Sequence, residues 1–147
     1  MTQEHWINSL KANRLMRSHE EVNAFENALC QLAEHPQNED LAALHLIFDD
    51  RCEQPEVMFS LVHFLESLAL EEQLQAFVTV VPQLIVIAPD WTKILHTRIL
   101  NDEEACSLYR EKLRSANASS PHFIRHLLEE SASYRLTYRD LSAELAI

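Results

Sequence analysis

Glycine is absent from all 147 residues of this chain. Average usage of about 7% would supply roughly ten glycines, so the absence constrains the backbone strongly. Tight hairpin turns, phosphate-binding loops and nucleophile elbows all depend on backbone angles that glycine adopts most readily. The sequence therefore disfavours β-hairpins and excludes Walker and dinucleotide-binding loops. Chain reversals have to use Pro, Asn, Asp and Ser, which favours helices joined by short connections.

Helix N-terminal patterns recur along the chain, and apolar residues spaced three or four apart follow each of them. Ser18 and Glu21 form a capping box, in which each side chain bonds the backbone N–H of the other. Asn38 is placed to cap the next helix. Pro55 and Pro89 suit the first turn of later helices, where the missing N–H does no harm. These patterns predict a succession of short amphipathic helices.

The second half of the chain continues in the same way. Pro82 is expected to kink or split a helix, and residues 101–104 offer a further N-cap. Ser115–Ser120 is predicted to be a loop, and helices are predicted to start at Pro121 and to cover Leu136–Ile147. The predicted fold class is all-α: a single domain over residues 1–147, with about seven to nine short helices stacked as antiparallel pairs in a solenoid-like bundle.

The negative charge of the chain is confined to one stretch. Residues 18–90 hold fourteen carboxylates and one basic side chain, Arg51, whereas both flanking regions are close to balanced. This stretch carries the whole net charge of −11. A one-sided anionic field attracts a cationic partner and repels nucleic acid and anionic lipid. The sequence therefore predicts a protein partner and binding to neither nucleic acid nor membranes.

Cysteine usage and the apolar runs indicate the compartment. Three scattered cysteines are too few for a disulfide framework, which favours reduced thiols. The N-terminal residues lack the basic start and apolar stretch of a secretory signal. The most apolar run, Phe77–Ala88, contains Pro82 and is shorter than the roughly 20 residues that span a membrane. We therefore expect a cytoplasmic protein.

Asp49, Asp50, Glu53 and Glu56 crowd one short segment, where only Arg51 compensates them. Many other acids lie in the first turn of a predicted helix, where the helix dipole stabilises a negative charge. Asp49 and Asp50 instead follow the C-terminal end of a predicted helix, where the dipole disfavours a negative charge. One of them could instead cap the following segment. Two readings stay open. The segment is either a solvated loop with a local ion pair, or an acidic hook that binds Arg or Lys of a partner.

Three side chains of the helix predicted to begin at Pro55 extend this candidate surface. Phe59, His63 and Glu66 fall on the face opposite its apolar stripe. Phe59 is either covered by a second layer of helices or exposed as an aromatic anchor. Glu26 is another acid that no helix end explains. The predicted partner-binding residues are Asp49, Asp50, Glu53, Glu56, Phe59, His63, Glu66 and Glu26.

No catalytic, cofactor or metal site is predicted. His122 and His126 lie four residues apart on one helical face, but a zinc site needs a third ligand. Ser60 and His63 share a helical face, but nothing in the sequence supplies an oxyanion hole or a third orienting group. We expect a protein that is not an enzyme and that needs no cofactor.

Four stretches of unusual sequence point to a family: Leu46–Asp50, Pro55–Glu66, Ala88–Trp91 and Arg98–Asp102. Over about Leu41–Asp102 the chain resembles the immunity protein 30 family, which is attached to bacterial polymorphic toxins and contact-dependent growth-inhibition systems. The resemblance implies a small helical cytosolic protein that binds and blocks one cognate toxin domain. Such toxins are often cationic nucleases acting on RNA or DNA.

Charge and resemblance together predict an immunity protein that occludes the active cleft of a basic toxin domain. An alternative of a different class is a helical-repeat adaptor, whose acidic face binds a basic cellular protein or peptide.

Overall fold

The structure is a computed structural model, and it describes residues 3–34 and 40–117. Within these two ranges the chain forms seven helices and no strand, which confirms the all-α prediction. The helices are α1 (Gln3–Asn13), α2 (His19–Glu34), α3 (Leu41–His45), α4 (Pro55–Glu66), α5 (Leu70–Ile87), α6 (Pro89–Asn101) and α7 (Glu103–Asn117).

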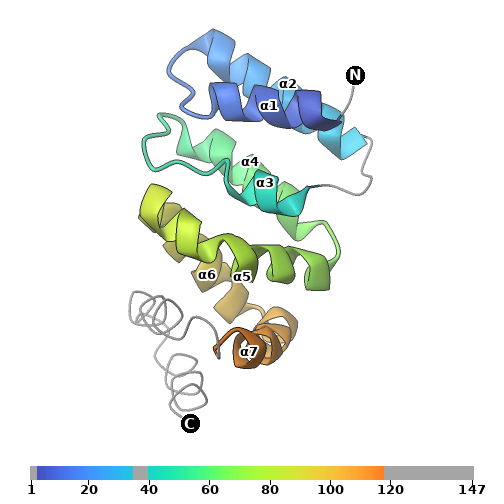
Figure 1. Cartoon of the computed structure of the whole chain (residues 1–147). Helices are drawn as coiled ribbons and strands as arrows, with labels where there is room; N and C mark the ends of the chain where they lie inside the picture. The colour runs from blue at the N-terminus through green and yellow to red at the C-terminus, as the bar shows by residue number, and fades with distance from the viewer. Residues whose placement is uncertain (1–2, 35–39, 118–147) are drawn as a thin grey trace.

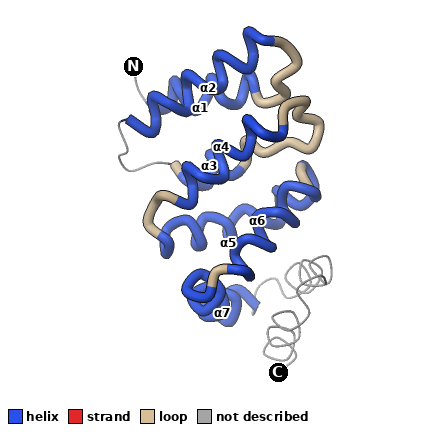
Figure 2. The backbone as a smooth tube through the Cα atoms, turned by 180° about the vertical axis from the view of Figure 1, so that it is seen from behind, coloured by secondary structure: helices blue, strands red, loops and turns tan. Residues whose placement is uncertain are grey.

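The helices stack in successive layers along one direction (Figure 1). α1 packs against α2, then α3 lies beside α4 and α5 beside α6, and α7 follows at the far end. The view from behind shows α2, α4 and α6 on the opposite side of the stack from α1, α3 and α5 (Figure 2). α5 is the most connected helix, because it contacts α3, α4, α6 and α7.

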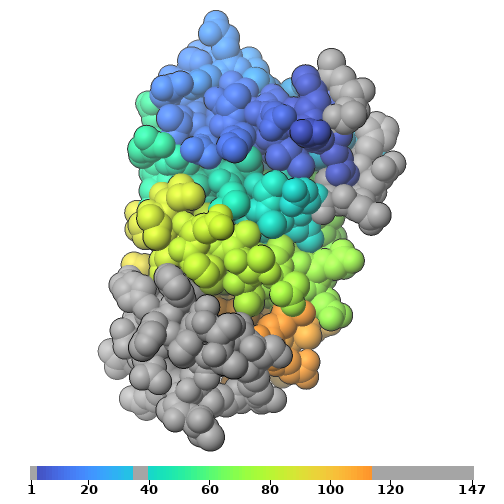
Figure 3. Space-filling view, in the orientation of Figure 1, coloured from blue at the N-terminus to red at the C-terminus, as the bar shows by residue number. Residues whose placement is uncertain are grey.

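One apolar core runs through all of these layers. It extends from Ile7 and Leu10 of α1 to Tyr109 and Leu113 of α7. Side chains fill the spaces between the layers on the face made by α1, α3 and α5 (Figure 3). Burying each large apolar side chain contributes about 1.5–3 kcal/mol, so the layers support one another through this shared core.

α5 runs for 18 residues without a break at Pro82. Of the two predicted effects of Pro82, a kink or a split, the split is therefore wrong. A proline inside a helix removes one backbone hydrogen bond, but Val81 and Leu84 on either side of Pro82 are buried, and this packing holds the two turns together. α5 is also the single described helix that is long and apolar enough to cross a membrane. The core helix of a soluble protein has the same length and composition, and α5 lies among four other helices.

Two helices differ from the predicted elements. α1 was not predicted, because Trp6, Ile7 and Leu10 make only a short apolar repeat; its stability comes from packing against α2. α7 continues through residues 115–117, where a loop was predicted. Ala favours a helix, and Ser and Asn oppose one only weakly, so the last turn continues through them. The helices predicted beyond Pro121 lie outside the described residues.

The predicted helix starts are largely confirmed. Pro55 begins α4 and Pro89 begins α6. Ser18 Oγ accepts the N–H of Glu21 at 3.2 Å, as a capping box requires. The Glu21 carboxylate, however, accepts the backbone N–H of Arg17 at 2.8 Å and also binds its guanidinium. Asn38 is outside the described ranges, and a different acceptor caps α3.

That acceptor is Asp40, whose Oδ1 accepts the N–H of Ala43 at 3.0 Å. Asp40 sits directly before the first residue of α3, the position at which a carboxylate reaches the free N–H groups of the first turn.

Candidate functional site

The segment between α3 and α4, residues 46–54, holds the predicted acidic hook, and its first acid is buried. Asp49 is 1% exposed. Its carboxylate accepts the backbone N–H of Arg51 at 2.9 Å and two guanidinium bonds from the same residue at 3.1 and 2.9 Å. Arg14 Nε lies 3.4 Å from Asp49 Oδ2. The hydrogen bonds from Arg51 hold the pKa of Asp49 below its usual value. The local ion pair of the first predicted reading is therefore present, but Asp49 itself is buried and does not form an exposed hook.

Asp50 has a structural partner 40 residues later in the chain. Its two carboxylate oxygens accept the N–H of Asp90 at 2.9 Å and of Trp91 at 3.1 Å. Ala88, the N-cap residue of α6, has no side chain that can cap these groups. Asp50 thus caps α6 from outside, at the helix end where an anion is favoured. The sequence left open that one of the two aspartates caps the following segment; Asp50 does act as a cap, but of α6 rather than α4.

The remaining acids of this region are at the surface. Glu53 and Glu56 are exposed, and so are Glu26 of α2 and His63 of α4. The backbone N–H of Glu53 donates to Leu15 O at 2.9 Å, which attaches the segment to the α1–α2 connection. The assignment of these four exposed side chains to a partner surface stays a prediction.

Phe59 is covered by a second layer of helices, the first of its two predicted readings. Its ring lies 5.1 Å from that of Trp91 in α6, with the planes at 65°, and Phe48 lies 5.4 Å from the same Trp91. Phe59 is half-buried and packs on the core. The face of α4 that was predicted to be opposite the core therefore points toward α6, and Phe59 is not an exposed anchor.

Glu66, at the end of α4, forms a two-pronged ion pair with α6. Its Oε2 accepts from Arg98 Nε and its Oε1 from Arg98 Nη2, each at 2.7 Å. The hydrogen bonds from Arg98 to Glu66 raise the pKa of the guanidinium. The two side chains are 38% and 39% exposed, so solvent screens their attraction.

We expect Glu66→Gln to lower the free energy of unfolding by less than about 1 kcal/mol, because exposed ion pairs contribute about 0.2–1 kcal/mol. Urea denaturation of both proteins at one salt concentration measures the difference. A loss above about 2 kcal/mol would mean that the pair is a structural clamp of the buried kind.

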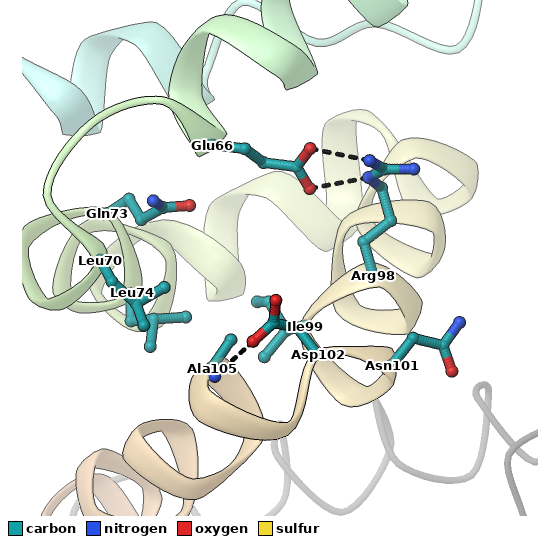
Figure 4. Close-up of a pocket in the computed structure, with 9 residues that line it drawn as sticks. All are labelled: Glu66, Leu70, Gln73, Leu74, Arg98, Ile99, Asn101, Asp102 and Ala105. Carbon is teal, nitrogen blue, oxygen red and sulfur yellow. Dashed lines mark hydrogen bonds and ion pairs between the residues drawn. The ribbon is translucent and has the colours of Figure 1, made fainter.

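This ion pair borders a pocket of about 400 Å³ at the corner where α4, α5, α6 and α7 meet (Figure 4). Asp102 stands opposite Glu66, and its Oδ1 caps α7 by accepting the N–H of Ala105 at 2.9 Å. Sequence reasoning missed the pocket, because it is built from the ends of helices distant in sequence. We call it the corner pocket; its lining residues are Glu66, Leu70, Gln73, Leu74, Arg98, Ile99, Asn101, Asp102 and Ala105.

Two histidines inside the core were also missed. His96 is fully buried, with its ring 6.4 Å from that of Phe77 and 5.3 Å from that of Tyr109. Burial lowers the pKa of His96 to about 3. His45 is buried as well, its Nδ1 donates to Leu41 O at 2.7 Å, and burial lowers its pKa. Both rings are neutral at physiological pH and cannot reach a ligand at the surface.

The described part of the chain offers no cluster of metal-binding side chains. No group of three or more His, Cys, Asp or Glu side chains within residues 3–34 and 40–117 could hold a metal ion. His122 and His126, the pair considered from sequence, lie outside the described residues.

Comparison with known proteins gives one match. The family model for immunity protein 30 covers residues 12–109, a wider span than Leu41–Asp102, where the resemblance was seen. No curated protein and no solved structure matches the chain. The matched span runs from α1 into α7, contains the α3–α4 segment and the corner pocket, and is well over half of the chain. The chain therefore belongs to the immunity protein 30 family.

Proposed function

We propose that this immunity protein binds a basic toxin domain, a nuclease delivered by a contact-dependent inhibition system, and occludes its active cleft in the cytoplasm. Family membership already implies that the protein binds a cognate toxin. It also favours this function over a helical-repeat adaptor. The family model does not define the charge or the activity of the toxin, so the proposal for both is argued from the surface.

The observation that carries the proposal is a surface rich in exposed carboxylates, although Asp40 caps α3 and Glu71 Oε1 lies 3.8 Å from Lys112 Nζ. Asp49 and Asp50 are held by intramolecular bonds, and Glu66 by Arg98. Nine other carboxylates between residues 18 and 90 are exposed, and they are distributed over four helices and the segments that connect them. They are Glu20, Glu26, Glu34, Asp40, Glu53, Glu56, Glu71, Glu72 and Asp90.

A nuclease is a chemically suitable partner for such a surface. An enzyme that binds nucleic acid presents Lys and Arg to the phosphates, and an acidic protein attracts the same groups. Charge complementarity speeds association up to about 10⁸–10⁹ M⁻¹s⁻¹ at low salt, which matters when a toxin has to be captured before it acts. Steric occlusion needs no catalytic group on the immunity protein. An interface of about 1,600 Å² is sufficient for nanomolar affinity when its contacts are good.

The test reverses charges that the fold does not use. We expect Glu26→Lys/Glu53→Lys to slow association with the cognate toxin domain by about tenfold or more at low salt, because steering is lost. The effect should shrink as salt is raised, since ions screen exposed charges. Stopped-flow or surface-based kinetics at several salt concentrations, together with growth protection of cells that express the toxin domain, measure it.

A matched control carries the same charge change outside the acidic region and away from the corner pocket: Glu4→Lys/Glu111→Lys, at two exposed positions. It should associate close to the rate of the parent protein. If both double variants associate at the rate of the parent, the acidic surface does not steer the toxin and the proposal of a basic partner fails.

A further inference from the structure

The corner pocket presents hydrogen-bond acceptors to a ligand from three sides. Asp102 Oδ1 takes the N–H of Ala105, which leaves Oδ2 to face the pocket. Gln73 Nε2 donates to Leu68 O at 3.1 Å, which leaves its Oε1 as an acceptor. Both oxygens of Glu66 bind Arg98, but a carboxylate oxygen accepts more than one bond. In Figure 4 these three side chains point toward one shared space from α4, α5 and the α6–α7 junction.

Apart from Arg98 and Asn101, the rest of the pocket lining is apolar. Leu74 and Ala105 are buried, and Leu70 and Ile99 are half-buried. An apolar wall beside polar acceptors suits a side chain that has a methylene stem and a charged tip. The volume of about 400 Å³ is within the range of about 300–1,000 Å³ that small ligands occupy, so the pocket has room for one long side chain.

The net charge of the pocket determines whether the charged end of the bound side chain is positive or negative. Among the described residues that line the pocket, Arg98 is the one base that opposes Glu66 and Asp102, and the exposed Glu103 and Glu104 follow directly. Because Glu66 holds the guanidinium of Arg98 through two bonds, Arg98 serves to fix Glu66 rather than to attract an anion. The pocket therefore favours a cation with several donors. A guanidinium carries five N–H donors in a plane and can reach separate acceptors, whereas an ammonium is a single point charge.

We propose that the corner pocket holds an arginine side chain of the toxin domain and anchors the complex. This inference rests on the proposed function and adds a defined contact to it. The exposed acids steer the toxin during encounter, and the pocket holds one side chain after docking. A steering residue changes mainly the association rate, whereas an anchor changes mainly the dissociation rate.

The first experiment needs no toxin. ¹⁵N-labelled protein is titrated with N-acetyl-arginine amide and, separately, with N-acetyl-citrulline amide, which has a similar shape but no charge. We expect saturable shifts of the Gln73, Asp102 and Ala105 amide resonances with the arginine probe, with a Kd of order 1–10 mM for one side chain. Citrulline should bind at least about fivefold more weakly, because it lacks the charge that strengthens each bond.

Two double variants extend this titration. Glu66→Gln/Asp102→Asn removes both charges of the pocket but keeps the cap of α7, because Asn is as good an N-cap as Asp. It should lose the arginine shifts. Glu4→Gln/Glu111→Gln removes two exposed charges elsewhere and should keep them. Absence of saturable arginine shifts in the parent protein, or equal binding of citrulline, would overturn the arginine pocket.

The second experiment uses the toxin domain. We expect Glu66→Gln/Asp102→Asn to raise the dissociation rate of the complex by about tenfold or more, with Glu4→Gln/Glu111→Gln within about twofold of the parent protein. Should the parent protein fail to bind or neutralise the toxin domain, the proposed function fails. A parent protein that neutralises the toxin while the pocket variant dissociates at the parental rate would reject the anchor and leave the proposed function standing.

Discussion

The free energy of unfolding is expected to fall steeply as the pH drops below about 6.5, because two neutral histidines are buried in the core. His96 has a pKa of about 3 in the folded protein, against an ordinary value of 6.5, and burial is the cause. Between these two values the unfolded chain binds a proton at His96 and the folded chain does not. Stability therefore rises with pH through this window and levels off above pH 6.5.

The size of the effect follows from proton linkage. Each pH unit well inside the window costs about 1.4 kcal/mol per histidine. The unfolded His96 is half protonated at pH 6.5, so His96 alone removes about 2 kcal/mol between pH 6.5 and pH 4.5. His45 contributes in the same direction, since burial lowers its pKa too. The ionisation of Asp49 affects stability in a different, more acidic pH range. Its lowered pKa gives stability that is present above its ordinary value of 3.8 and is lost only as the pH falls through the folded value.

Urea denaturation at half-unit steps from pH 7.5 to pH 4.5 measures this slope. His96→Phe keeps a ring beside Phe77 and Tyr109 but removes the titrating group, so its profile should lose about 1.4 kcal/mol per pH unit of slope relative to the parent protein. A parental profile that is flat between pH 6.5 and pH 5 would contradict the assignment of His96 as a buried neutral base.

Asp50→Ala is expected to destabilise the fold by about 2–4 kcal/mol. Hydrogen bonds to a charged group contribute about 1.5–3 kcal/mol each, and Asp50 accepts two of them, from Asp90 and Trp91. The carboxylate also lies at the positive end of the α6 dipole. Alanine leaves both N–H groups without this acceptor and detaches the α3–α4 segment from α6.

The measurement is the urea midpoint at constant m-value. Asp50→Asn keeps one acceptor oxygen and should lose about half as much stability. Glu56→Ala removes an exposed acid from the first turn of α4 and should cost less than about 1 kcal/mol, as a surface charge near a helix N-terminus does. Equal small losses for Asp50→Ala and Glu56→Ala would show that Asp50 is a solvated acid of the loop.

Much of the helix order could be predicted from local sequence, because the forces that begin a helix act within a few residues. Ser18, Pro55 and Pro89 begin helices through their own backbone or side chain, and all three starts were predicted. α1 was missed because its stability comes from α2 rather than from its own pattern. The end of α7 was misplaced because weak propensities do not define a boundary.

The candidate site was less predictable, because its contacts join residues that are far apart in sequence. Asp50 looked like an acid at the wrong end of a helix until its partner, the start of α6, was known. Glu66 looked unpaired because Arg98 comes 32 residues later. The uneven distribution of charge is evident from the sequence alone. Which of the acids are exposed is evident only from the structure. Asp49 shows the difference, since the most acidic segment of the chain has a buried carboxylate at its centre.

The α3–α4 segment has a mechanical consequence for recognition. Through Asp49 and Glu53 it is bonded to Arg14 and Leu15 in the layer before it, and through Asp50 to α6 in the layer after it. Adjacent helix layers cannot slide past each other or separate along this edge without breaking those bonds. We therefore expect this edge of the stack to change little when a toxin docks, so that little conformational entropy is lost there.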